Sequence, residues 1–294
     1  MLLALMMLPL PAIASATPAL PAGLLMIGFD GTSWHPYLSD SLTNSWRKVT
    51  EIRNPAGVTY QSDAARFLFK GSDGRLYEYI DGDSVAMPLQ QFDTTSYTQL
   101  RAIDDGFLMV KLIGGKSRET QLVSLDNDYR PASVLRQDSA QFHPLYHGNR
   151  LYYSHVSCRQ ECEPLIQEVW VKDLITGNAR QLTLLNATSY LHSIDHSGRY
   201  GVISSNSNGY YNLARLDLST NAITWLTAGR FTDSYPAIAD DGVLYFLRRT
   251  KEETRLMRLA DTLSWTEDFV NSGNAETVHL PDEVEKVRYL ESSR

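Results

Sequence analysis

The feature that most constrains this chain is an internal repeat marked by six aspartates. Each aspartate ends an alternating apolar segment and precedes a turn, and successive members lie 41, 45, 47, 44 and 44 residues apart. The six are Asp40, Asp81, Asp126, Asp173, Asp217 and Asp261. A period near 45 residues with strand-like alternation is typical of β-propellers, in which each repeat forms one blade. The sequence therefore predicts an all-β, six-bladed propeller of four-stranded antiparallel blades.

Two further markers keep the same period. A turn such as Asp105-Gly106 or Asp241-Gly242 precedes a strongly apolar segment in each repeat, and glycine suits the positive φ that such turns demand. A Leu-Thr pair closes repeats, as at Leu182-Thr183 and Leu226-Thr227. We interpret the six aspartates as structural, because a carboxylate at the end of a strand readily accepts hydrogen bonds from the following turn. The competing interpretation, metal ligands, would require aspartates that the blade symmetry keeps apart.

The N-terminal repeat is one strand short. Residues 23–50 contain segments suited to the second, third and fourth strands of a blade, but none suited to the first. Two apolar segments of the C-terminal tail, 277–280 and 287–290, could each supply it. We expect the tail to pair with the N-terminal blade, which would remove an exposed sheet edge and close the ring.

The repeats resemble the WD40-like (PD40) repeats of the TolB-like propeller family. That pattern joins Tyr-Pro and an Asp-Gly turn to a strand that ends in Asp and is followed by Gln-Leu-Thr, and it is matched best at 234–242 and 169–183. It departs from the family in lacking proline before the turn in every blade, and Ala64 replaces the turn glycine in the first full repeat. The resemblance covers nearly all of the chain after residue 16 and implies a binding propeller of the bacterial envelope.

The first sixteen residues have the character of an export signal. They are apolar and end in Ala14-Ser15-Ala16, small residues of the kind that precede a signal-peptidase site. We therefore expect a signal peptide at 1–16, a single propeller domain at 17–294, and a periplasmic location in a Gram-negative bacterium. No Lys or Arg precedes Arg47, so an uncleaved anchor stays an alternative, although the apolar run is shorter than the roughly 20 residues of a membrane span.

The chain contains two cysteines, Cys158 and Cys162. Cysteines this close in an exported chain form a disulfide more often than a metal site, so we predict a disulfide between them. Zinc would need further ligands, and His155 alone does not complete a set of four. A redox switch is the alternative to a structural staple.

Charge and motifs exclude several classes of function. The net charge of −7, with no long run of Lys or Arg, argues against a nucleic-acid partner, which requires clustered positive charge. The sequence lacks a Gly-x-Ser-x-Gly elbow, a His-Glu-x-x-His motif and a phosphate-binding loop. We therefore expect no catalytic residue, no cofactor and no bound metal.

Propellers generally bind ligands where their innermost strands converge at the channel mouth. Alignment of the repeats places five candidates at the entry to these strands, and the alternative role for each is channel packing. They are Tyr60, Arg101, His143, His192 and Tyr235. His143 and His192, with His147 and His196, also raise a second hypothesis of a metal or proton-transfer cluster, but no carboxylate partner is fixed by spacing, and we favour turn or surface histidines.

We therefore predict a non-catalytic periplasmic binding or scaffold protein whose propeller face binds an envelope protein or peptide. We expect a monomer that associates with membranes through a partner or an uncleaved N-terminus. One alternative is the extracytoplasmic sensor propeller of a membrane-bound winged-helix regulator. The other is a lactonase-like, metal-dependent propeller enzyme, whose scattered ligands would leave little trace in a sequence.

Overall fold

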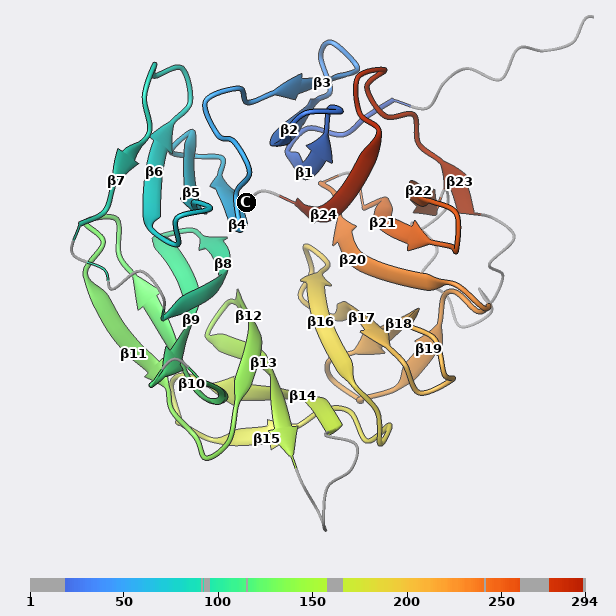
Figure 1. Cartoon of the computed structure of the whole chain (residues 1–294). Helices are drawn as coiled ribbons and strands as arrows, with labels where there is room; N and C mark the ends of the chain where they lie inside the picture. Colours follow the sequence, from blue (N-terminus) through green and yellow to red (C-terminus); the bar gives the residue numbers. More distant parts are fainter. Residues whose placement is uncertain are drawn as a thin grey trace, which may run out of the picture.

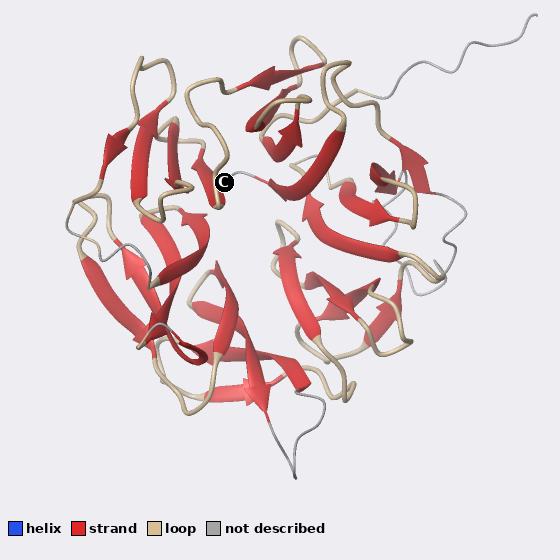
Figure 2. Cartoon of the chain, in the orientation of Figure 1, coloured by secondary structure: helices blue, strands red, loops and turns tan. Residues whose placement is uncertain are grey.

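The computed structural model describes residues 19–90, 92, 96–114, 116–157, 166–240, 242–259 and 275–292. All regular elements in these residues are β-strands, and Figure 2 shows only strands and loops there. No segment in this part of the chain forms a helix long and apolar enough to cross a membrane. Residues 1–16 and both cysteines lie outside the described residues, so the predicted signal peptide and disulfide stay predictions.

Twenty-four strands form six four-stranded antiparallel sheets, which stand around a central axis as the blades of a propeller (Figure 1). We number the blades I to VI and give each from its innermost strand outward. Blade I is β24 (Lys286–Ser292), β1 (Leu24–Phe29), β2 (Trp34–Asp40) and β3 (Ser45–Lys48); blade II is β4 (Gly57–Gln61), β5 (Arg66–Lys70), β6 (Leu76–Ile80) and β7 (Met87–Pro88); blade III is β8 (Tyr97–Ile103), β9 (Gly106–Ile113), β10 (Lys116–Leu125) and β11 (Pro131–Leu135). Blade IV is β12 (Gln141–His147), β13 (Arg150–Ser157), β14 (Ile166–Asp173) and β15 (Ala179–Gln181); blade V is β16 (Ser189–Ile194), β17 (Tyr200–Ser205), β18 (Asn212–Asp217) and β19 (Ile223–Trp225); blade VI is β20 (Thr232–Ile238), β21 (Leu244–Arg249), β22 (Thr254–Leu259) and β23 (Ala275–Thr277). The predicted fold class is confirmed.

The second strand of each blade is apolar on both faces because a neighbouring sheet covers each face. In β9 the residues alternate between two clusters. Phe107 and Met109 pack in a cluster shared with blade II, whereas Leu108 and Val110 pack against Tyr153 of blade IV. All four residues from Phe107 to Val110 are fully buried. The core of the protein is thus a series of sheet-to-sheet interfaces around the ring.

The C-terminal strand closes the ring, as predicted. β24 pairs antiparallel with β1, so that Leu25 lies opposite Glu291, and Figure 1 shows the two strands side by side. Val287 and Leu290 of β24 are buried in the cluster between blades I and VI. Of the two tail segments that could have supplied this strand, the structure selects 287–290. The other segment begins in β23, which is the outer strand of blade VI.

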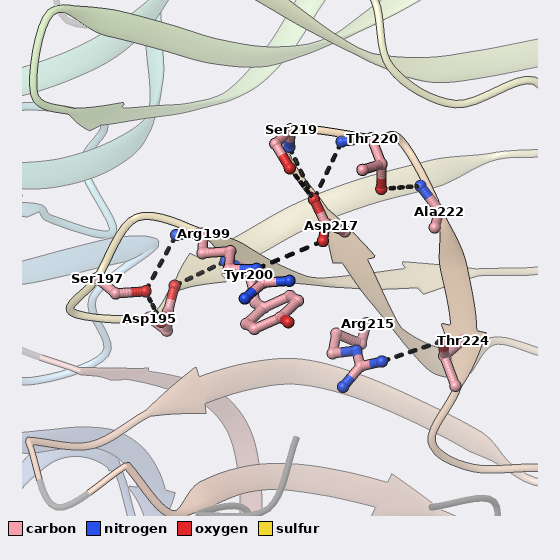
Figure 3. A network of polar contacts seen from close by, with 10 residues as sticks. All are labelled: Asp195, Ser197, Arg199, Tyr200, Arg215, Asp217, Ser219, Thr220, Ala222 and Thr224. Carbon is pink, nitrogen blue, oxygen red and sulfur yellow. Dashed lines mark hydrogen bonds and ion pairs between the residues drawn. The ribbon is translucent and has the colours of Figure 1, made fainter. Parts of the chain in front are cut away.

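Four of the six marker aspartates accept backbone hydrogen bonds from the turn that follows, as expected for a structural role. Figure 3 shows this for Asp217, which accepts from the backbone N–H of Ser219 and of Thr220 at 2.9 and 3.0 Å. The Ser219 hydroxyl and these N–H groups lower the pKa of Asp217 to about 2. The other three are Asp40, Asp126 and Asp173.

Asp81 and Asp261 do not extend this pattern. The turn after Asp81 closes through a backbone bond from Asp83 to Ile80 of 3.0 Å, and Gly82 has a φ of +98°. The carboxylate of Asp81 accepts instead from Arg47 Nη1 at 3.0 Å and so links blade II to blade I. Asp261 lies outside the described residues.

Candidate functional site

A β-bulge interrupts five of the six innermost strands at equivalent positions, and only β4 is regular. The pairing shifts between Thr98 and Arg101 in β8 and between Ser234 and Ala237 in β20, and similar shifts occur in β12, β16 and β24. A bulge leaves a residue outside the ladder and redirects its side chain. The residues at the bulges are Gln99, His143, His192, Tyr235 and Arg288.

Proline explains two of these bulges. Pro144 and Pro236 follow the bulged residues His143 and Tyr235, and proline has no N–H to give to the ladder. The backbone at Gln99, His143 and Tyr235 has φ of 52°, 51° and 52°, a region that residues with side chains seldom adopt. Three blades therefore hold the same uncommon conformation where the strand meets the channel, a kind of strain that concentrates at functional sites.

The bulged residues line two adjoining cavities at the end of the channel where the innermost strands begin. Together we call them the entry cavity, because His143, His192, Tyr235 and Arg288 line both. The inner lobe, of about 320 Å³, lies deeper and is also lined by Gln99, Arg101 and 288–292. The outer lobe, of about 380 Å³, is also lined by Tyr190, Tyr211, Ser204, Thr232, Ser234, Leu247, Arg249, Thr254 and Val287.

Aromatic rings form a continuous row across this cavity. Starting from Tyr211, the ring centroids are 6.1 Å apart to Tyr190 and then 4.3 Å to His143. The row continues to His192 at 5.6 Å, to Tyr235 at 5.8 Å and to Tyr289 at 5.3 Å. These six residues come from blades IV, V, VI and I, so the row depends on the closed ring.

The floor of the inner lobe is a buried polar network centred on Glu291. This carboxylate accepts from Thr59 Oγ1 at 2.9 Å and from the Tyr289 hydroxyl, and it lies 3.4 Å from Arg101 Nη1. Thr59 in turn accepts from the backbone N–H of Ala102 at 2.7 Å. Arg101 also donates to the carbonyl of His192. The guanidinium of Arg101 therefore joins blade III to blades I and V across the channel.

Both histidines of the cavity are held neutral. Burial, with a smaller contribution from Arg101, lowers the pKa of His143 to about 4. Burial, His143 and Arg101 lower the pKa of His192 well below its usual value. The Nε2 atom of His192 is buried without a hydrogen-bond partner in the described part of the chain. Burial and Glu291 raise the pKa of Tyr289, which stays protonated.

Comparison with known proteins finds solved structures with the same architecture. No family model matches the chain, and no curated protein matches it in sequence. Solved structures do match: TolB from Acinetobacter baumannii superposes with a TM-score of 0.71 at 13% identity, covering 92% of this chain and 67% of that one. A putative TolB from Agrobacterium tumefaciens gives a TM-score of 0.63 at 13% identity and 88% coverage of both chains. The fold is that of a TolB-like β-propeller.

The β-propeller domain of the Trilobed protease from Pyrococcus furiosus is also similar, with a TM-score of 0.54, 11% identity, and coverage of 89% of this chain and 84% of that one. That domain is described as having an open velcro topology. In this TolB-like propeller, by contrast, β24 completes blade I and supplies Arg288, Tyr289 and Glu291 to the entry cavity.

The structure brings four of the five predicted site residues together. Arg101, His143, His192 and Tyr235 all line the inner lobe of this TolB-like propeller. Tyr60 lies elsewhere: its ring is 4.4 Å from that of Phe67, and it packs against the cluster between blades I and II. Because β4 has no bulge, Tyr60 keeps its place in the regular ladder and faces the cluster between blades I and II.

The four histidines of the second hypothesis divide between the two ends of the channel. His147 ends β12 and His196 lies in the β16–β17 turn, and both line a cavity of about 830 Å³ at the opposite end, which we call the exit mouth. Asp104, Asp105 and Asp240 also line the exit mouth. The described residues contain no group of three or more His, Cys, Asp or Glu side chains placed to hold a metal ion.

Sequence reasoning missed Tyr190, Tyr211 and Arg249 of the outer lobe. Of the inner lobe it missed Gln99, Arg288, Tyr289 and Glu291. Gln99, two residues before Arg101, is the true equivalent of His143 and Tyr235, but it is followed by leucine and not by proline. The other three lie in β24. The sequence left open which of the two tail segments forms the missing innermost strand. If 286–292 is aligned as that strand, Arg288 falls at the position of the bulged residues.

Proposed function

We propose that this TolB-like propeller is a non-catalytic binding protein of the cell envelope that captures a protein or peptide partner at its entry cavity. The observation that carries the proposal is the entry cavity itself, where five bulges direct side chains from five blades into one space. Tyrosine and arginine are the side chains that most often anchor protein interfaces, and this cavity is rich in both.

The rigidity of the cavity supports binding. Its side chains stand on strands of a closed ring, and Pro144 and Pro236 fix the backbone beside His143 and Tyr235. A site held in advance loses little conformational entropy when a partner binds. An extended peptide could lie along the aromatic row, which crosses four blades.

The partners of the two neutral histidines favour binding over catalysis. A catalytic base acts on a nucleophile and is itself oriented by a third group. The His143 imidazole packs against Tyr190 and lies 3.5 Å from Gln99 Nε2, and the His192 imidazole packs against His143 and Tyr235. Neither imidazole has a carboxylate partner within the described residues, so we favour a recognition role.

The envelope location is supported by the TolB-like fold and by the apolar segment at 1–16. We expect the mature protein to begin at Thr17 and to be released in the soluble fraction by osmotic shock. N-terminal sequencing of the tagged protein from that fraction tests this. A product found only with membranes, with residues 1–16 intact, would contradict it.

Site-directed photo-crosslinking tests partner capture. Replacing Tyr211 by p-benzoylphenylalanine puts the crosslinker on the outer lobe, whereas the same replacement of Leu42, which is 95% exposed in the β2–β3 turn, serves as the control. In cells that naturally contain the protein, we expect one discrete adduct at Tyr211 and none at Leu42. Adding Tyr235→Ala should remove that adduct. No adduct at Tyr211, or the same adduct at both positions, would contradict capture at the entry cavity.

A further inference from the structure

The outer lobe of the entry cavity is positively charged, although the chain as a whole is acidic. The thirteen residues that line this lobe include Arg249 and Arg288 and no Asp or Glu. The chain as a whole carries a net charge of −7. A cavity that the described residues line with two guanidinium groups and no carboxylate is therefore a local feature that the overall composition does not explain.

The contrast with the preceding arginine is informative. Arg248 is fully paired: its Nε and Nη2 lie 2.8 and 2.9 Å from the two carboxylate oxygens of the buried Asp233. It also lies over the ring of Phe231, 3.8 Å from the centroid. Arg248 is thus part of the scaffold. Arg249, the next residue, pairs through its backbone with the neighbouring strands, but its side chain has no hydrogen bond or ion pair within the described residues, and it ends β21 at the rim of the outer lobe.

Arg288 is oriented but not neutralised. Its guanidinium lies over the ring of Trp34, 4.5 Å from the centroid, and donates from Nη2 to the carbonyl of Pro55. A carbonyl oxygen and an aromatic face hold a guanidinium in place without cancelling its charge. Burial lowers the pKa of Arg288, with a smaller opposing effect from Tyr235. The remaining N–H groups of Arg288 can bind an anion.

The walls between these arginines suit an apolar or aromatic group. Tyr190, Tyr211 and Tyr235 line the same lobe, and Nε2 of His192 is a buried polar atom that no described residue satisfies. The inner lobe is different, because Arg101 already forms an ion pair with Glu291 there. An anion that enters the cavity therefore meets its strongest attraction in the outer lobe.

We propose that the outer lobe binds a carboxylate that is attached next to an aromatic or apolar group, with Arg249 and Arg288 as its anchors. The inference rests on the proposed function and specifies the chemistry of the partner: the acidic end or an acidic side chain of a peptide, with its hydrophobic neighbour on the tyrosines. A planar carboxylate matches the fork geometry of guanidinium groups, and such charge-assisted bonds are strong.

The test compares pairs of probes that differ only in the carboxylate. N-acetylphenylalanine and its neutral amide represent a small free acid, and Ac-Gly-Ser-Gly-Ser-Gly-Phe with a free or an amidated C-terminus represents a peptide end. Binding to the purified full chain is followed by NMR titration. We expect the acid of each pair to bind about tenfold or more tightly than its amide, as a charge-assisted hydrogen bond implies. If the peptide with a free C-terminus binds more tightly than N-acetylphenylalanine, the natural ligand is a peptide. If the two acids bind with equal affinity, the natural ligand is a small acid.

Variants locate the effect. Arg249→Ala changes an exposed side chain that has no partner among the described residues, so the fold should be unaffected. It should reduce the acid preference several-fold, and adding Arg288→Lys should reduce the preference further. Arg255→Ala removes one charge from the same blade, where Arg255 pairs with Glu253 away from the cavity, and should leave the preference unchanged. Loss of preference in Arg255→Ala would point to a general effect of charge and would overturn the site.

Three other results would overturn the carboxylate assignment. They are equal binding of acid and amide, binding of neither pair, and displacement of the acids by inorganic phosphate at lower concentration than by acetate. The proposed function is judged separately, because the crosslink at Tyr211 does not depend on charge. An adduct there together with no acid preference would keep partner capture and remove only the carboxylate.

Discussion

The first prediction concerns Glu291, which lies where the C-terminal strand meets three blades. Glu291→Gln keeps the size of the side chain and an oxygen that can accept from Thr59, but it removes the charge opposite Arg101. Glu291→Ala also removes the acceptor and leaves the hydroxyls of Thr59 and Tyr289 without their partner. Glu291 is only 3% exposed, so water replaces only part of what is lost.

The expected magnitudes follow from burial. Hydrogen bonds to charged groups contribute about 1.5–3 kcal/mol, so we expect Glu291→Gln to lower the free energy of unfolding by about 2 kcal/mol. Removing one partner of a buried ion pair costs about 3–5 kcal/mol. The Arg101 side chain is 18% exposed and lines a cavity, so water can reach it, and we expect the lower limit of about 3 kcal/mol for Glu291→Ala.

Urea unfolding followed by tryptophan fluorescence measures both values. With an m-value of about 3 kcal/mol/M, a loss of 2 kcal/mol lowers the urea midpoint by about 0.7 M. Glu285→Gln, an exposed glutamate just before β24, is the matched control and should change stability by less than about 0.5 kcal/mol. A double-mutant cycle with Arg101→Met should give a coupling energy of about 1–2 kcal/mol. Shifts for Glu291→Gln no larger than the control, or additive effects in the cycle, would refute the closure role of this network.

Three further predictions concern a turn and two titrating groups. Gly106 has a φ of +137°, and an added Cβ would lie 2.0 Å from the carbonyl oxygen of Leu125, so Gly106→Ala should lower the free energy of unfolding by about 3 kcal/mol. Gly148→Ala, at a φ of +55° with open space around it, should lower it by about 1 kcal/mol in the same urea assay. Equal losses of stability would contradict the steric cause. The pKa of His143 is lowered to about 4, so the folded state binds this proton less well than the unfolded state, and stability should fall as pH drops from about 6.5 to 4. Urea midpoints measured against pH should show a smaller fall in His143→Asn. An unchanged slope in that variant would contradict the prediction. The pKa of Asp217 is lowered to about 2, so the stability that its carboxylate contributes is present above pH 4 and is lost as pH falls towards 2. Asp217→Asn should therefore have a lower melting temperature than the wild type at pH 7 and a similar one at pH 2. A constant difference in melting temperature across that range would contradict the prediction.

The sequence was sufficient for the ring because the ring depends on short-range patterns. The turns after Asp126, Asp173 and Asp217 and the buried run from Phe107 to Val110 each follow from local alternation and turn chemistry, which repeat six times. Closure was also predictable, because a blade short of one strand must find it elsewhere. The choice between two tail segments was not predictable, since both are apolar and short, and the partner strand β1 is more than 200 residues away.

The cavity was only partly predictable, and the reason is the bulges. A bulge breaks the alternation on which the direction of a side chain is inferred, so Gln99 could not be separated from Arg101 by periodicity. The prediction that Tyr60 lies at the channel mouth fails for the opposite reason, because β4 lacks the bulge that the other innermost strands have. Alignment of the repeats found His143 and Tyr235, and the proline that follows each of them is the sequence signal that marks their bulges.

The two ends of the channel differ in charge, and this difference bears on how a partner would enter. Arg249 and Arg288 line the entry cavity, whereas Asp104, Asp105 and Asp240 line the exit mouth. Between them Arg101 reaches from β8 to the carbonyl of His192 and to Glu291, so its guanidinium is bound on two sides. An acidic segment is therefore attracted at one end and repelled at the other. We expect such a partner to insert its acidic end into the entry cavity without threading the ring, so a bulky group attached to that end should abolish binding, while the same group at the opposite end of the peptide should not.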